Sequence, residues 1–412
     1  MILDLLFVLS VLFPYVTLLP FGTDLQPTCL VLSCVMLSRG KISKPAPPHL
    51  WLLGYMLLAA LSVAFIGEAT FPALRSLANY VSIFLISLAS YHFFSLTKLD
   101  VVFWTKLANA VWLAVGLGQT FLSSNLLNGI LPDVRRTASR GVVSLAPEPG
   151  FYATTCLFFL LLLYLFKQER TIHGLICVLQ ITLLARSSII TVFLACGLLV
   201  YLATSWTVRN MLAVAVVAVA GWFAVTQTDI LENSRLHDVF SLAVADPTSL
   251  THKDPSISDR VGQLVFSLRG SLENYLLPNG FSSWGPYYYS EVLKGRNWLT
   301  PYWGNRYPDR IQSGIGAVFY ELGAFGFIVP IVFLAGTKRR FGRLGARSAV
   351  VFLTVVGLTL LPATPIATPM YGFLLGYLFA PHRLGSEETR NLTHNNRSAD
   401  YFRLMSAGVC RS

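Results

Sequence analysis

The sequence predicts an all-α polytopic membrane protein of about twelve transmembrane helices, with one large external loop that contains short amphipathic helices. Of its 412 residues, 54% are hydrophobic and only 12% are charged, whereas soluble proteins carry about 25% charged residues. The apolar segments are hydrophobic on every side, as in "MLAVAVVAVAGWFAV" (211–225). Strands of an outer-membrane barrel would instead alternate apolar and polar residues over about ten positions. The helical class follows from this difference.

Each predicted helix is an apolar stretch close to the roughly 17 to 25 residues that cross a hydrocarbon core. In chain order these stretches are 2–20, 22–38, 49–67, 76–96, 102–123, 150–166, 172–185, 187–204, 210–227, 313–336, 347–362 and 364–380. The pair around Arg186 is short, so its ends are the least sharply defined. The first stretch has Asp4 where a signal peptide would carry basic residues, which indicates a retained helix.

Lysine and arginine in the short loops predict the orientation, because these residues stay on the cytoplasmic side of a membrane. They fall on alternate loops, beginning with Arg39, Lys41 and Lys44, and both chain ends lie on the basic side. We therefore expect a multi-pass protein of an inner or plasma membrane with both termini in the cytoplasm. The net charge of +11 comes largely from these loops, so it predicts no nucleic-acid partner.

The same alternation divides the chain into four parts. They are the N-terminal helices 1–227 with a small external loop at 124–149, the large external loop 228–312, the C-terminal helices 313–380 and a cytoplasmic tail 381–412. The large loop far exceeds the usual connection of up to about 12–15 residues, and its many Trp and Tyr residues predict order. Within it, residues 258–277 have apolar side chains at the helical spacing of a surface-lying amphipathic helix.

Arginine outnumbers lysine in the predicted external loops. Its planar guanidinium matches phosphate oxygens and stays charged at physiological pH. The candidate ligands of a lipid pyrophosphate are Arg135, Arg136, Arg140, Arg186, Arg306 and Arg310. The alternative is that these arginines pair with nearby acidic residues or extend to lipid headgroups.

Glu148 lies between two prolines in "APEPGFYA" (146–153), at the predicted start of a helix. A carboxylate there is favoured by the helix dipole, so a capping role is one interpretation. The other is that Glu148 positions an arginine or takes a proton from a sugar hydroxyl.

Aromatic residues crowd the second half of the large loop. They could stack on sugar faces, or they could form the aromatic belt of a membrane interface. The candidate sugar-binding residues are Trp284, Tyr287, Trp298, Trp303 and Asp309. We find no ATP-binding motif and no metal-ligand spacing in the sequence, and we expect no cofactor.

Four stretches, in this order, resemble the polytopic O-antigen polymerases and ligases of bacterial surface-polysaccharide assembly. They are "SRGVVSLAPEPGFYA" (139–153), "LLARSS" (183–188), "SDRVGQLVFSLRGSLENYLLPNGF" (258–281) and "QSGIGAVFYELGAFGFIVPIVFL" (312–334). The resemblance covers roughly residues 100–335 and rests on the order of the motifs. It implies a substrate that consists of an oligosaccharide linked to undecaprenyl pyrophosphate, with a flippase and a chain-length-regulating copolymerase as partners.

The resemblance implies functional roles for Glu148, Arg186 and Arg260. For the general base we expect Glu148 or Asp259. Ligases of this kind carry a histidine next to an asparagine just ahead of the helix where the last long loop re-enters the membrane. Here that place holds Gln312 and Ser313, which favours a polymerase. Preorganised arginines can stabilise the charge of a departing pyrophosphate without a metal, so we expect a metal-independent enzyme. A ligase that transfers glycan to lipid A core and a transporter of lipid-linked sugar are the alternatives. A transporter would collect its charges near the bilayer midplane.

Overall fold

The computed structural model describes most of the first 381 residues. The described ranges are 2–17, 25–39, 44–65, 70–97, 99–135, 141–168, 171–204, 238–239, 241–242, 245–246, 249, 253–293, 311–341, 346–361 and 364–381. The chain divides into two units, Met1–Phe379 and Ala380–Ser412. All helices described below belong to the first unit, and all but the first residue of the predicted tail lies outside the described ranges.

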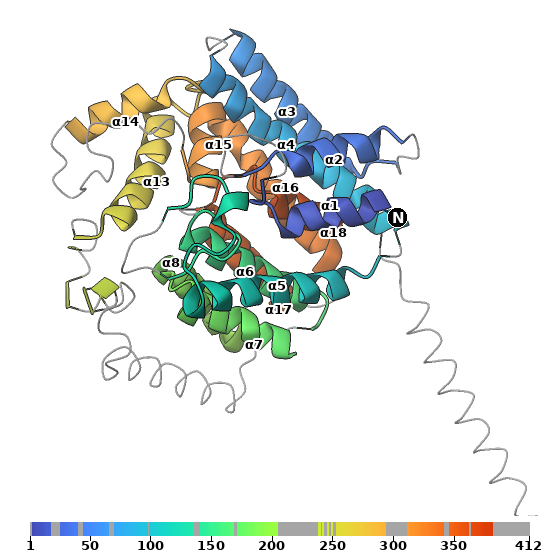
Figure 1. The fold of residues 1–412 in the computed structure, drawn as a ribbon. Helices are drawn as coiled ribbons and strands as arrows, with labels where there is room; N and C mark the ends of the chain where they lie inside the picture. Colours follow the sequence, from blue (N-terminus) through green and yellow to red (C-terminus); the bar gives the residue numbers. More distant parts are fainter. Residues whose placement is uncertain are drawn as a thin grey trace, which may run out of the picture. The chain divides into compact units, whose positions relative to one another are not determined.

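Every regular element within the described ranges is a helix (Figure 1). The elements are α1 (Ile2–Leu12), α2 (Thr28–Leu37), α3 (Pro47–Phe65), α4 (Phe71–Leu96), α5 (Val101–Phe121), η1 (Asn128–Ile130), α6 (Pro149–Leu165), α7 (Ile172–Leu179), η2 (Gln180–Leu184), α8 (Ser188–Ala203), α13 (Pro255–Glu273), α14 (Trp284–Leu293), α15 (Gly314–Leu322), η4 (Gly323–Phe327), α16 (Ile328–Phe341), α17 (Ala346–Leu360) and α18 (Pro369–Phe379). The all-α prediction is confirmed for this part of the chain.

Long apolar helices identify a membrane protein. Four helical stretches in the described ranges are long and apolar enough to cross a bilayer, namely Pro47–Phe65, Phe71–Leu96, Val101–Phe121 and Gly314–Phe341. Shorter apolar helices of 10–17 residues occupy the other predicted positions, except 210–227, which lies outside the described ranges. The count of about twelve spans stays a prediction.

Proline explains where the helices depart from the predicted bounds. The first stretch was expected to run to residue 20, but α1 ends at Leu12 because Pro14 cannot continue a helix and restricts the residue before it. The fourth predicted helix, 76–96, begins earlier than expected, because α4 starts at Phe71. The Thr70 side chain accepts a hydrogen bond from the Ala73 N–H at 3.4 Å, and Pro72 occupies the first turn. These are common features of a helix start.

Helices α4 and α18 pack against each other extensively, and small residues let their backbones approach. A Cβ atom added at Gly372 would lie 2.8 Å from Ile86. Ser87 and Ser90 on α4 are fully buried, and Gly376 packs against Ser90. Glycine and serine at a helix contact are typical of packing inside membranes, where van der Waals contact drives association.

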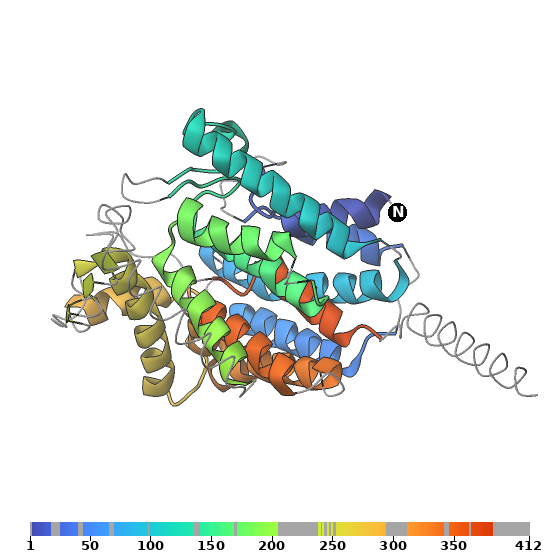
Figure 2. The ribbon, with the colours of Figure 1, turned by 90° about the horizontal axis from the view of Figure 1, so that it is seen from below.

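Helix α13 packs against both α14 and α15, and α13 and α14 lie together at the edge of the helical bundle (Figure 2). A Cβ atom added at Gly270 would lie 2.8 Å from Tyr320 and 2.9 Å from Tyr287. Aromatic side chains fill the space between these helices. The buried cluster consists of Phe266, Trp284, Tyr288, Ile311, Ala317 and Tyr320. Trp284 and Tyr288 of the large loop therefore belong to a packed core.

An ion-pair network also holds α13 to α14. Arg269 Nε lies 2.5 Å from Glu273 Oε1, and its Nη1 lies 3.6 Å from the buried Glu291. The Tyr287 hydroxyl donates to Glu273 at 2.9 Å. Burial, together with this hydrogen bond, raises the pKa of Tyr287. Arg269 is therefore a structural residue of the loop.

The apolar stripe predicted on α13 faces away from the bundle. Val265 and Leu272 on this stripe are 38% and 65% exposed, whereas the buried face carries Phe266 together with polar residues such as Gln263 and Ser267. Beyond the helix, Tyr275 and Leu277 are exposed as well. An outward apolar face is expected of a helix that lies in a membrane interface.

Several helix ends meet at one end of the bundle, which we call the loop end. It comprises the starts of α4, α6 and α15 and the end of α17. The contacts that join them to one another, to α13 and to the segment between α13 and α14 are Thr70 with Ser282, Gln312 with Gln263, Gly150 with Arg260 and Ser313 with Leu361.

Candidate functional site

The segment ahead of α6 is fixed by buried hydrogen bonds. The Gln119 side chain accepts from the Ser144 N–H at 2.7 Å and donates to the Ser144 carbonyl at 2.9 Å. The Ser144 hydroxyl donates to the Trp112 carbonyl at 2.7 Å. Ser144 is fully buried and has a left-handed backbone with φ of 51°, which a non-glycine residue adopts when its surroundings hold it. Helix α5 thus positions the chain that leads to Glu148.

Glu148 holds an arginine at the start of α6. It occupies the N-cap position of α6, yet its side chain makes no capping hydrogen bond. Instead, Glu148 Oε1 lies 2.9 Å from Arg135 Nε, and the Arg135 N–H donates to the Pro147 carbonyl at 2.8 Å. The side chains of Arg135 and Glu148 are 35% and 17% exposed. Of the two interpretations of Glu148, the geometry favours the one in which it positions an arginine.

Arg260 reaches the same place from α13. Its Nη2 atom lies 3.5 Å from the point where a Cβ on Gly150 would stand, so the guanidinium rests against the first turn of α6. Arg260 thus comes to the same helix start as Arg135 and Glu148, from which it is distant in the sequence. We call these residues and Gly150 the α6 entrance.

Arg186 lies on the adjacent turn. It follows η2, a π-helical turn at the end of α7, and has a left-handed backbone with φ of 47°. The Val142 N–H donates to the Leu184 carbonyl at 2.9 Å, which joins this turn to the segment ahead of α6. The exposed Arg186 side chain donates to the Leu183 carbonyl at 3.3 Å and forms no ion pair within the described ranges. π-Helical turns are frequent at functional sites.

Asp259 lies beside Arg260 but is engaged in the loop core. Gln263 donates to its Oδ2 at 3.0 Å, and the Tyr288 hydroxyl bonds to its carboxylate. Burial and the Asp259 charge raise the pKa of Tyr288. Asp259 is 5% exposed. This environment favours Glu148 over Asp259 as the residue that meets a substrate.

The predicted sugar-binding residues in the described ranges take part in packing. Trp284 is 3% exposed and lies against Tyr288 and Tyr320, with ring centroids 5.2 and 5.1 Å away. Tyr287 packs against the same cluster. Sugar stacking by these two rings stays a prediction to which the packing lends no support. Other predicted site residues lie outside the described ranges, namely Arg136, Arg140, Trp298, Trp303, Arg306, Asp309 and Arg310.

Two charged residues near the loop end were not among the predicted site residues. Glu321 is buried in α15 and accepts a hydrogen bond from the Tyr80 hydroxyl at 2.5 Å. Arg75 lies near the start of α4 and lines a pocket. Both stand as single charges inside apolar sequence, a signal that marks functional or partnered residues in membrane proteins and could have identified them.

The α6 entrance combines features that bind a multivalent anion. Guanidinium groups form strong charge-assisted hydrogen bonds with phosphate oxygens. The start of a helix adds a positive dipole and backbone N–H groups without intrahelical partners. In the described part of the chain, no three His, Cys, Asp or Glu side chains gather as metal ligands. The arginines and the helix start are therefore the groups from which an anion site can be built.

The chain matches no protein-family model and no curated protein sequence. Its function is therefore argued from the geometry of the site and from the motifs in its own sequence.

Proposed function

We propose that this membrane protein is a polysaccharide polymerase, a metal-independent glycosyltransferase that joins undecaprenyl-pyrophosphate-linked repeat units at the periplasmic face of a bacterial inner membrane. The observation that carries the proposal is the α6 entrance, where Arg135, Glu148 and Arg260 meet at a helix start. The product would be an O-antigen, capsular or secreted polysaccharide.

The outward apolar face of α13 supports this proposal. With Val265 and Leu272 in the lipid interface, Arg260 on the opposite side would lie near the depth of lipid headgroups. A lipid pyrophosphate has its phosphates at that depth. The ligand would then reach the α6 entrance without leaving the membrane.

The proposed reaction exchanges one bond at the anomeric carbon. A hydroxyl oxygen of the acceptor sugar attacks C1 of the donor glycan, and the C1–O bond to the pyrophosphate breaks. The hydroxyl proton passes to Glu148, whose Oε2 has no other partner within the described ranges. The bonding electrons leave with the lipid pyrophosphate, and Arg260 and Arg186 stabilise its charge.

The lengths of lipid-linked and surface glycans in cells test this proposal. Cells would carry the wild-type protein, Arg260→Ala, Glu148→Ala or a control, Arg339→Ala, with membrane levels of each measured. Arg339 is an exposed arginine in the last turn of α16, so the control removes the same charge elsewhere. We expect single repeat units on the lipid in the first two variants and wild-type lengths in the control.

Two results would contradict a polymerase. Long lipid-linked chains that stay unattached to lipid A core would identify a ligase. Single units that stay trapped in the cytoplasmic leaflet would identify a flippase.

A further inference from the structure

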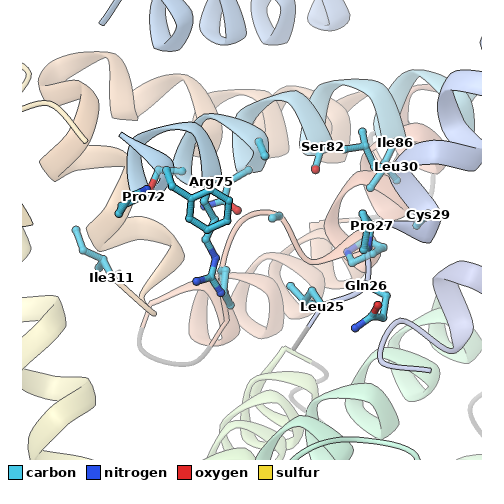
Figure 3. Close-up of a pocket in the computed structure, with 17 residues that line it drawn as sticks. Leu25, Gln26, Pro27, Cys29, Leu30, Pro72, Arg75, Ser82, Ile86 and Ile311 are labelled. Carbon is cyan, nitrogen blue, oxygen red and sulfur yellow. The ribbon is translucent and has the colours of Figure 1, made fainter. Parts of the chain in front are cut away.

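A cavity lies at the loop end, apart from the α6 entrance. We call it the α4 pocket. It has a volume of about 380 Å³, within the range of roughly 300–1,000 Å³ of small-molecule sites. Its walls come from the first half of α4, the start of α2, the turn ahead of α18 and Ile311 (Figure 3). None of Arg135, Glu148 and Arg260 lines it.

The α4 pocket combines one charged group with a lining that is mostly apolar. Among the described residues that line it, Arg75 is the only charged one, and its side chain points into the hollow (Figure 3). Ile86 and Leu30 line the far side, where Ser82 lies as well (Figure 3). Arg75 and Ile86 are about three turns apart on α4, or roughly 16 Å. A single arginine in a mostly apolar lining matches a molecule with an anionic head and a hydrocarbon tail.

One short path of contacts joins the α4 pocket to the α6 entrance. Ile311 lines the pocket, and the N–H of the next residue, Gln312, donates to Gln263 Oε1 at 2.6 Å. Gln263 lies on α13, one turn beyond Arg260. A molecule in the pocket would therefore lie close to the helix that carries Arg260.

From this arrangement, we infer that the α4 pocket binds the phosphate end and first isoprene units of the acceptor lipid, while the α6 entrance binds the donor pyrophosphate. The inference rests on the proposed function, because a polymerase holds two lipid-linked substrates at once. Arg75 would bind the phosphate, and Ser76 and Asn79 line the same pocket. Leu30 and Ile86 would contact the hydrocarbon.

Native mass spectrometry of the full-length protein in detergent tests the inference, with undecaprenyl phosphate as the probe. We expect Arg75→Ala to bind one lipid fewer than the wild type, and Arg75→Ala with Arg260→Ala to lose a further one. Arg339→Ala, the matched control, should bind as the wild type does. Ala78→Trp provides a second variant, because Ala78 is an exposed lining residue whose enlargement narrows the pocket without a change of charge.

An unchanged lipid count in both Arg75→Ala and Ala78→Trp overturns the inference. Displacement of the Arg75-dependent lipid by equimolar phosphatidylglycerol overturns it as well, because the pocket would then take any anionic lipid. The proposed function fails separately, through normal glycan lengths in Arg260→Ala cells. The two failures are therefore distinguishable.

Discussion

Arg135 Nε lies 2.9 Å from Glu148 Oε1, and this ion pair joins the loop ahead of α6 to the residue that begins the helix. Since Glu148 makes no capping hydrogen bond, the carboxylate is committed to the arginine and to whatever occupies the α6 entrance. A partly exposed ion pair contributes only about 0.2–1 kcal/mol to stability. We therefore infer that this ion pair matters more for the chemistry of the site than for stability.

Neutralisation of the two candidate general bases, Glu148 and Asp259, should have different effects on activity. Glu148→Gln removes a proton acceptor that faces the α6 entrance, and we expect polymer formation to fall by roughly 10²–10⁴-fold. Asp259→Asn changes a carboxylate already bonded to Gln263 and Tyr288, so activity should stay within about tenfold of the wild type once protein levels are equalised. The measurement is the rate at which isolated membranes that contain each variant extend the glycan chain. The reverse order of effects would assign the base to Asp259.

Gly150 offers a graded test of the position of Arg260. A methyl group at Gly150 would lie 3.5 Å from Arg260 Nη2, an ordinary van der Waals contact, so Gly150→Ala should retain activity. Gly150→Leu would occupy the space of the guanidinium and should resemble Arg260→Ala. Chain extension by the two variants is the measurement. Full activity in Gly150→Leu would show that Arg260 does not act at this helix start.

Replacement of Gln119 should lower the stability of the fold more than it lowers catalytic activity. Gln119→Leu would leave the buried N–H and carbonyl of Ser144 without partners, at a cost of about 1–3 kcal/mol for each group. We expect a lower Tm for the purified protein in detergent. Thr120→Ala, a change of an exposed residue on the same turn, is the control. Equal Tm values for the two variants would show that the hydrogen bonds between Gln119 and Ser144 do not stabilise the fold.

The Tyr80–Glu321 hydrogen bond links α4 to α15. Tyr80→Phe removes the donor from a buried carboxylate, which should cost about 1.5–3 kcal/mol. Glu321→Gln keeps an acceptor oxygen for Tyr80 and should cost less. Thermal unfolding of both variants provides the comparison. A larger loss of stability in Glu321→Gln than in Tyr80→Phe would show that the carboxylate has a more important partner than Tyr80.

Hydrophobic pattern alone predicted the helical class and the approximate place of most described helices, since long apolar runs need no tertiary information. It missed the break in the first stretch at Pro14 and the early start of α4 at Thr70, although both are local signals. The outward direction of Val265 on α13 was beyond prediction, because it depends on which partner the helix finds.

For the site, the motifs singled out Glu148 and Arg260, and the sequence suggested that Glu148 positions an arginine. It did not show that this arginine is Arg135, or that Arg260 lies against Gly150. The meeting at Gly150 depends on how α13 packs against α15, a relationship between segments far apart in the chain. The burial of Trp284 could not be predicted either, because an aromatic residue suits a core as well as a sugar site.

Release of lipid pyrophosphate by the purified full-length protein tests the proposed reaction most directly. The protein would be reconstituted in vesicles with an undecaprenyl-pyrophosphate-linked repeat unit, and free lipid pyrophosphate and glycan length would be measured together. We expect the wild type and Arg339→Ala to release lipid in step with chain growth, and Arg260→Ala to do neither. Chain growth at the wild-type rate in Arg260→Ala, or no bond formation by any variant, would contradict a polymerase built on the α6 entrance.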